Sequence, residues 1–164
     1  GVRRPAETTS GPAVDLDGWL VEAGRRPGVV NIVCGASETG AAVVTHPTAA
    51  KIAFTGSTEV GKVIMRQLAG TDKKLTLELG GKAANIVFDD SPVDQAVEGV
   101  VNGIFFNQGH VCCAGSRLLV QESIAEMFVA KLKNRIDVLR VGNRLDKNTD
   151  VGAINSKAQL ERVP

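Results

Sequence analysis

Short apolar segments alternate along this chain with longer segments of helical periodicity. Residues 51–55 and 84–88 are predicted strands, whereas residues 92–107 carry apolar side chains at helical spacing, including Val97 and Val101. Glycines separate several of these segments, because glycine tolerates the backbone conformations that tight turns require. Strands that alternate with helices are typical of an α/β fold with a mainly parallel sheet.

Serines stand at the expected starts of several helices. Ser37 can cap a short helix that stops before Pro47, and Ser57 or Thr58 can cap a helix that runs to about residue 68. Ser123 and Glu126 form the S-x-x-E pattern of a capping box at the start of a later helix. These residues place the predicted helix boundaries.

The composition narrows the class of protein. Hydrophobic residues make up 43% and charged residues 23% of the chain, which predicts a packed globular protein. The net charge is +1 without a basic stripe, and no apolar run approaches the roughly 18 residues of a membrane span. We therefore expect neither a nucleic-acid nor a membrane partner. Cys34, Cys112 and Cys113 lack the spacing of a metal site, so we expect free thiols, a cytoplasmic location and no metal.

The stretch FTGSTEVGK, residues 54–62, joins a predicted strand to a predicted helix. Its G-x-x-x-x-G-K spacing begins a P-loop, but Val63 stands where a magnesium-binding hydroxyl is required. A triphosphate-hydrolysing loop is therefore not expected, and the G-x-G-x-x-G dinucleotide fingerprint is also absent. The helix start still offers outward-pointing N–H groups and a favourable dipole. Spacing alone leaves open an anion site or a capped surface helix behind a glycine turn.

Two further stretches carry chemically reactive side chains. Glu78 stands in LELGGK, residues 77–82, at the end of a strand in which leucines alternate with polar residues. Cys112 and Cys113 stand in FFNQGHVCCAGSR, residues 105–117, after the predicted buried helix. A thiolate can act as a nucleophile, and a carboxylate near it in space can act as a general base. On spacing alone, adjacent cysteines are more often inert small hydrophobic residues, and a glutamate in this position is more often a surface strand residue.

Taken together, these stretches resemble the NAD(P)-dependent aldehyde dehydrogenases. The matching motifs, in order, are RPAETT, PGVVNIV, FTGSTEVGK, LELGGK, FFNQGHVCCAGSR and VGAINSKAQLERV. LELGGK and the cysteine motif are the most specific, and the resemblance extends almost from end to end. It implies the middle third of such an enzyme, with residues 1–77 in a Rossmann-like cofactor-binding domain and residues 78–164 in an α/β catalytic domain.

The resemblance implies NAD as the cofactor, with NADP as the alternative, on a Rossmann variant that lacks the glycine fingerprint. Arg4 and Glu7 match a motif, usually Lys-Pro-Ala-Glu, that holds the adenosine ribose. Glu7 favours NAD, whereas the guanidinium of Arg4 can tolerate a 2′-phosphate. Ser57 and the Gly56 backbone are expected nearest the pyrophosphate, and Glu59 is less suited to touch it because like charges repel. The expected cofactor residues are Arg4, Glu7, Phe54, Gly56, Ser57, Thr58, Glu59, Val60, Gly61 and Leu79.

The resemblance also implies the catalytic residues. Cys112, four residues after Gln108, matches the nucleophile, and Glu78 matches the general base. Cys113 and His110 are not expected to take part. These roles imply that an aldehyde is oxidised to a carboxylic acid through a thioester, and Glu78 favours hydrolysis over acyl transfer to coenzyme A. The alternative is a non-catalytic homologue that serves as a binding or assembly module.

Some parts of the family's active site lie outside these residues. The asparagine that holds the oxyanion and the glutamate that holds the nicotinamide ribose belong to motifs that this chain lacks. We therefore expect the isolated chain to have little or no dehydrogenase activity. We expect the full-length protein to be a homo-oligomer, although the sequence fixes neither the oligomer nor the aldehyde.

Overall fold

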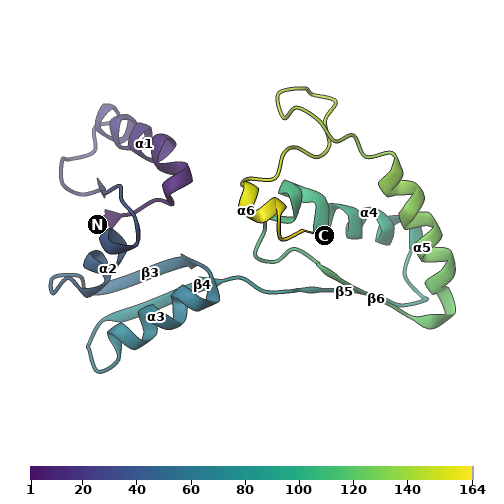
Figure 1. Ribbon diagram of the computed structural model, residues 1–164, viewed down its shortest axis with the longest axis horizontal. Helices are drawn as coiled ribbons and strands as arrows, with labels where there is room; N and C mark the ends of the chain where they lie inside the picture. The colour runs from purple at the N-terminus through teal and green to yellow at the C-terminus, as the bar shows by residue number, and fades with distance from the viewer. Residues whose placement is uncertain (164) are drawn as a thin grey trace. The chain divides into compact units, whose positions relative to one another are not determined.

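The computed structural model describes residues 1–163 and divides the chain into two compact units, Gly1–Leu79 and Gly80–Pro164 (Figure 1). All of the strand pairs that form the sheets of the described chain are parallel, and helices connect the strands. The α/β fold class is therefore confirmed. The predicted domain boundary between residues 77 and 78 falls inside the last strand of the first unit, β4 (Lys74–Leu79).

The first unit contains two pairs of parallel strands. β1 (Val2–Arg3) pairs with β2 (Asn31–Ile32), and η1 (Glu7–Thr9) and α1 (Ser10–Glu22) connect them. After α2 (Ser37–Thr45), β3 (Lys51–Gly56) pairs with β4, and α3 (Thr58–Leu68) forms the crossover between them. β1 and β2 are only two residues long each.

Helices α2 and α3 cover one face of the β3–β4 pair. Val44 of α2, Ile52 of β3, and Ile64 and Leu68 of α3 form a buried apolar cluster, and Leu75 of β4 packs against it. Ile64 and Leu68 lie on one side of α3 because they are four residues apart. This packing fixes the start of α3 relative to the ends of both strands.

The second unit pairs two strands under two helices. β5 (Ala84–Val87) is parallel to β6 (Arg117–Val120), and α4 (Val93–Phe105) and η2 (Phe106–Gly109) lie between them in sequence. α5 (Glu122–Asp137) follows, and α6 (Lys157–Leu160) lies near the end. Figure 1 shows α4 and α5 on the same side of the strand pair.

Phe128 of α5 is the centre of the second unit's core. Its side chain is fully buried and joins Val87 of β5 with Val97 and Val100 of α4 in one cluster. The three valines come from elements that the sequence predicted, and the spacing of Val97 and Val100 places these two on one face of α4. The core therefore holds α4 rigidly against the sheet.

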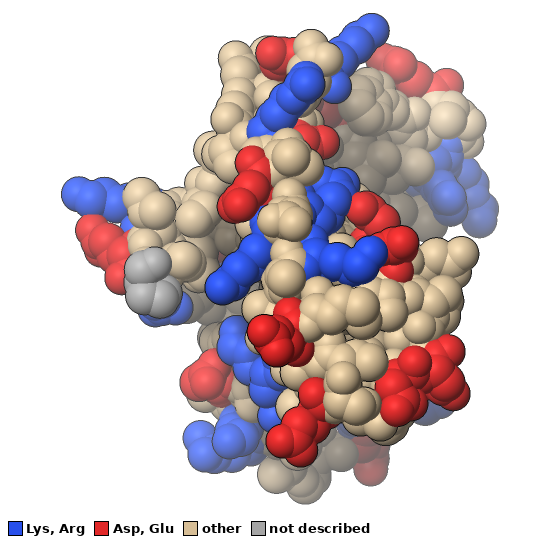
Figure 2. Space-filling model, turned by 90° about the vertical axis from the view of Figure 1, so that its right-hand side faces the viewer, with Lys and Arg blue, Asp and Glu red and all other residues tan. Residues whose placement is uncertain are grey.

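Two ion pairs join α4 and α5 at their exposed sides. Lys131 Nζ lies 2.6 Å from Asp94 Oδ1, and Arg135 Nε lies 2.6 Å from Glu98 Oε1. The hydrogen bond that Arg135 donates to the Glu98 carboxylate raises the pKa of the Arg135 guanidinium. On the face shown in Figure 2, acidic and basic side chains are interspersed rather than grouped by sign.

No helix within residues 1–163 has the length and apolar character that a membrane crossing requires.

Only one of the predicted serine caps forms. Ser57 Oγ accepts a hydrogen bond from the Val60 N–H at 3.3 Å. The other two helices begin earlier than predicted, so Ser37 and Ser123 lie inside the first turn and make no capping bond. The Ser123 hydroxyl instead donates to Asp89 Oδ2 at 3.3 Å. The predicted capping box at Ser123 is therefore wrong, because its serine lies too far into the helix.

Candidate functional site

The predicted phosphate-binding turn lies where β3 ends and α3 begins. Ser57 caps α3, since its hydroxyl accepts from the Val60 N–H and its carbonyl accepts from the Gly61 N–H at 3.0 Å. A Cβ added at Gly56 would lie 2.4 Å from Cζ of Phe54. The ring of Phe54 therefore lies against the backbone of the turn, and a side chain at position 56 would have to displace this ring.

Glu59 occupies the first turn of α3. Hydrogen bonds to its carboxylate from its own backbone N–H and then from the Ser57 hydroxyl lower the pKa of Glu59, and the charge of Lys62 adds to this effect. An ionised carboxylate at a helix start interacts favourably with the helix dipole. It also repels a second anion, which agrees with the expectation that Glu59 is less suited to contact a phosphate.

The end of β4 lies beside the same turn. In the parallel register, Gly56 lies opposite Leu79 and Thr55 lies opposite Glu78, so both strands end at one edge. Glu78 is exposed, whereas Leu79 points to the covered face. A Cβ added at Gly61 would lie 2.8 Å from Leu79 Cδ2, so α3 approaches this strand closely. Within the first unit, the structure thus brings Glu78 and Leu79 together with the predicted turn.

Arg4 and Glu7 form an ion pair just after β1. Arg4 Nε donates to the Gly35 carbonyl at 2.9 Å, and its guanidinium also donates to the Glu7 carboxylate. The pKa of Glu7 is lowered, first by a hydrogen bond from its own backbone N–H and then by Arg4. The Glu7 side chain remains 60% exposed. Its carboxylate is therefore ionised and free to accept hydrogen bonds from a ligand.

Cys112 lies in the second unit, in the segment of residues 110–116 that we call the Cys112 loop. The Ala114 N–H donates to the Val111 carbonyl at 3.0 Å and closes a turn with Cys112 and Cys113 at its centre. Both thiols are free and exposed. None of the hydrogen bonds formed among residues 1–163 uses the Cys112 backbone N–H. The loop therefore presents a thiol and an unused N–H group from one residue.

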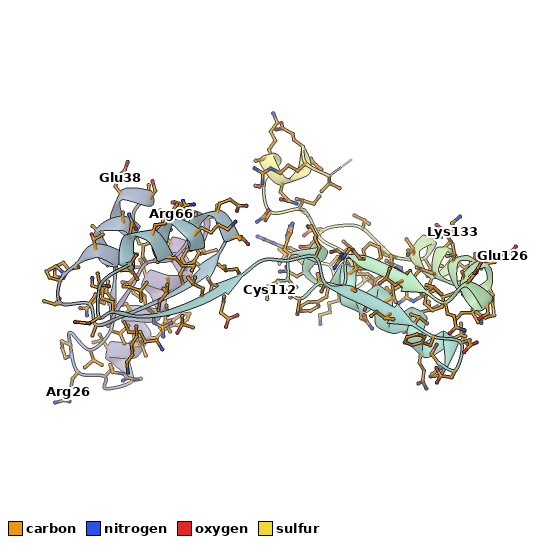
Figure 3. All side chains as sticks on the ribbon, turned by 90° about the horizontal axis from the view of Figure 1, so that it is seen from below. Arg26, Glu38, Arg66, Cys112, Glu126 and Lys133 are labelled. Carbon is orange, nitrogen blue, oxygen red and sulfur yellow. The ribbon has the colours of Figure 1, made fainter. Side chains whose placement is uncertain are left out.

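The residues just before the Cys112 loop have an unusual backbone. Asn107, Gln108 and Gly109 have φ angles of 49°, 54° and 75°, all in the left-handed region. The His110 N–H donates to the Asn107 carbonyl at 3.0 Å, which holds this turn. Asparagine tolerates this conformation better than most residues, whereas glutamine disfavours it, so the strain lies mainly at Gln108. Backbone strain of this kind is found most often at functional sites. Figure 3 shows Cys112 away from the α5 residues Glu126 and Lys133.

The structure also identifies a residue that the sequence reasoning missed. Asn85 of β5 donates from Nδ2 to the Gly115 carbonyl, at 3.2 Å, and so contacts the Cys112 loop. The signal in the sequence was a polar side chain between Ala84 and Ile86 in a strand predicted to be apolar. Glu78 belongs to the first unit and Cys112 to the second.

The first unit fits a dinucleotide in its chemistry. The Glu7 carboxylate can accept from ribose hydroxyls, and the glycine turn with the N–H groups at the start of α3 suits a pyrophosphate. Among residues 1–163, no three or more His, Cys, Asp or Glu side chains gather as a metal site would.

Comparisons with known proteins agree with these features. A sequence model described as the aldehyde dehydrogenase family matches residues 1–164. The chain is 47% identical over 164 residues to retinal dehydrogenase 2 of Mus musculus, covering 99% of this chain and 32% of that protein. It spans about a third of the length of the curated relatives that it matches.

The chain also superimposes on solved structures of longer proteins. An NADP dependent enzyme from E. coli superimposes with a TM-score of 0.95 at 37% identity, covering 98% of this chain and 34% of that one. Betaine aldehyde dehydrogenase from Staphylococcus aureus, in complex with NAD+, superimposes with a TM-score of 0.94 at 36% identity. That match covers 98% of this chain and 32% of the other.

Proposed function

This chain belongs to the aldehyde dehydrogenase family, and on that premise we propose that the protein containing it oxidises an aldehyde to a carboxylic acid. The observation that carries the proposal is the Cys112 loop, which presents an exposed thiol and an unused backbone N–H. It follows directly after the left-handed residues 107–109. A nucleophile and an oxyanion donor from one residue are what acyl chemistry requires.

In the proposed reaction, the thiolate of Cys112 adds to the carbonyl carbon of the aldehyde. The Cys112 N–H donates to the oxyanion that forms, and the asparagine expected elsewhere in the full-length protein supplies a second donor. The nicotinamide, when bound, supplies the two-electron acceptor that the oxidation needs. The acyl group is left as a thioester on Cys112.

Glu78 is proposed to act in the second half of the reaction. Its carboxylate takes a proton from water, and the hydroxide adds to the thioester carbon. The carbon–sulfur bond then breaks, which releases the carboxylic acid and restores the thiolate. Glu78 is suited to this role because it is exposed at the end of β4 and has access to water.

The proposed cofactor is NAD, held by the first unit. Arg4 already donates to Glu7 and to the Gly35 carbonyl, and the ionised Glu7 carboxylate would repel a 2′-phosphate. Gly56 and Ser57 would lie beside the pyrophosphate, with Phe54, Thr58, Val60, Gly61 and Leu79 around them. One of the similar structures is NADP dependent, so both dinucleotides belong in the test.

The test is an absorbance assay of the full-length protein with NAD and with NADP, over aliphatic, aromatic and betaine-type aldehydes. We expect turnover by the parent and by Cys113→Ala, and none by Cys112→Ala. The two variants are matched because both cysteines are exposed and adjacent in the same turn. A folded parent protein that has no dehydrogenase activity with either cofactor would overturn the proposal in favour of a non-catalytic binding or assembly module. Cytoplasmic location and homo-oligomerisation stay predictions.

A further inference from the structure

Asn85 places an amide on the covered side of β5. Its side chain lies on the same side as Val87, two residues later, which is buried against α4 and Phe128. A polar group on such a face carries a desolvation cost unless its hydrogen bonds are made. The hydrogen-bond partner of the Asn85 amide therefore indicates the role of this side chain.

Both main-chain groups of Gly115 take part in this arrangement. The Gly115 carbonyl accepts from Asn85 Nδ2 at 3.2 Å, and the Gly115 N–H donates to the Gly103 carbonyl at 3.0 Å. A Cβ added at Gly115 would lie 2.0 Å from Asn85 Nδ2. At Gly103 the added Cβ would lie 3.5 Å from the same atom. The Asn85 amide thus occupies the space that a side chain at position 115 would take.

These bonds anchor the C-terminal end of the Cys112 loop. Gly115 lies directly after the turn that Val111 and Ala114 close around Cys112, and its two bonds tie it to β5 and to α4. Because Phe128 and its valine neighbours fix α4 and β5 to each other, both anchors belong to one rigid core. The Asn85 bond therefore holds one end of the loop that carries the Cys112 thiol and N–H.

We propose that Asn85 is a positioning residue for Cys112, acting through Gly115. The inference rests on the proposed function, in which Cys112 supplies the thiolate and an oxyanion donor. Asn85 itself touches neither substrate nor cofactor in this scheme. It holds the end of the turn so that both Cys112 groups keep the geometry that attack and oxyanion binding require.

The test uses the full-length protein with Asn85→Ala and Asn85→Val. Both changes remove the donor, and valine also suits a half-covered strand, so at least this variant should fold. We expect kcat to fall about 10- to 100-fold, as for a small misplacement of a reacting group. We expect the affinity for NAD to stay that of the parent, because the predicted cofactor residues lie in the first unit.

A second readout needs no cofactor. Iodoacetamide labelling, resolved by tandem mass spectrometry, gives the ratio of the Cys112 and Cys113 labelling rates. We expect this ratio to change in both Asn85 variants and in Gly115→Ala, whose Cβ displaces the amide. Asn134→Ala on the exposed side of α5 removes an unrelated amide and should match the parent.

The outcomes separate the two proposals. Parent-like kcat and labelling ratios in folded Asn85→Ala or Asn85→Val would overturn the positioning role. Equal losses of NAD binding, folded fraction and kcat would also overturn it, because they indicate general destabilisation. A parent without dehydrogenase activity would instead refute the proposed function, and the labelling ratio would still decide the role of Asn85.

Discussion

At the scale of single residues, the backbone around Cys112 is more constrained than its sequence suggests. Asn107 and Gln108 adopt left-handed conformations that glycine would take without strain, and Gly109 continues them. The sequence motif predicted a glycine-flanked loop but not this turn, because asparagine tolerates a positive φ without requiring one and glutamine gives no signal of it. Their strain persists only because the core of α4 and the bonds of Gly115 hold both ends of the segment.

Gly109→Ala tests this strain. Gly109 has a φ of 75°, and an added Cβ would lie 3.2 Å from the Ile104 carbonyl oxygen. We expect a local destabilisation of about 1–2 kcal/mol, measured by hydrogen exchange of the peptide that contains it. Gly99→Ala in the exposed interior of α4 is the control and should stabilise that helix by about 0.5–1 kcal/mol. Equal effects of the two changes would show that position 109 is unstrained.

Glu7→Gln tests the cofactor preference. The neutral amide removes the charge that would repel a 2′-phosphate, so kcat/KM with NADP should rise roughly tenfold relative to NAD. The pKa of Glu7 lies below its ordinary value, so Glu7 loses its charge only at acid pH as the pH falls through the lowered pKa. The charge of Glu7 should therefore be constant between about pH 6 and about pH 8, so a change of the parent's preference near pH 6 would come from the 2′-phosphate, whose second pKa is about 6. An unchanged ratio in Glu7→Gln would remove Glu7 from the selectivity.

At the scale of elements, the sequence predicted the helices and strands better than it predicted their first residues. The alternation of leucines placed β4, and the apolar spacing placed α4, since burial of one face determines both patterns. The serine pattern failed at Ser37 and Ser123, because several local residues can serve as a helix start and tertiary packing selects one. Asn85 was missed because its partner Gly115 is distant in sequence, so that no local pattern shows the contact.

Ser57→Ala tests the one cap that forms. Loss of the bond to the Val60 N–H should destabilise α3 by about 1 kcal/mol, measured by hydrogen exchange of the α3 peptide in the full-length protein. The variant should also bind NAD more weakly, because the capped turn orients the N–H groups of the helix start. Ser37→Ala, which removes no capping bond, should change stability by less than about 0.5 kcal/mol. Similar losses in both variants would contradict the assignment of the cap.

At the scale of the whole molecule, the chain shows large apolar side chains that a complete protein would cover. In the second unit, Ile86 and Phe88 are each 61% exposed and Leu119 is 54% exposed. Ile86 and Leu119 lie on neighbouring strands, on the side of the pair that α4 and α5 leave open. The chain spans about a third of the length of the relatives that it matches, and we expect the remainder of a protein of that length to cover this face.

The isolated 164-residue chain should therefore be less stable than the same segment in the full-length protein. We expect it to bind the dye ANS, to associate with itself, and to unfold at a lower temperature. Ile86→Thr with Leu119→Thr should reduce the dye binding, whereas the same change at Val138, an exposed residue just after α5, should reduce it little. An isolated chain that is monomeric and excludes the dye would show that these faces need no cover.

The motifs predicted Cys112 and Glu78, but the joint action of the two residues stays a proposal. Trapping the acyl group tests it. We would incubate full-length Glu78→Gln with NAD and an aldehyde that the parent oxidises, and then locate the acyl mass by tandem mass spectrometry. We predict one equivalent of NADH and an acyl group on Cys112, because Cys112 still reacts while water is no longer activated. An acyl group on Cys113, or turnover equal to the parent without any trapped thioester, would contradict the proposed roles.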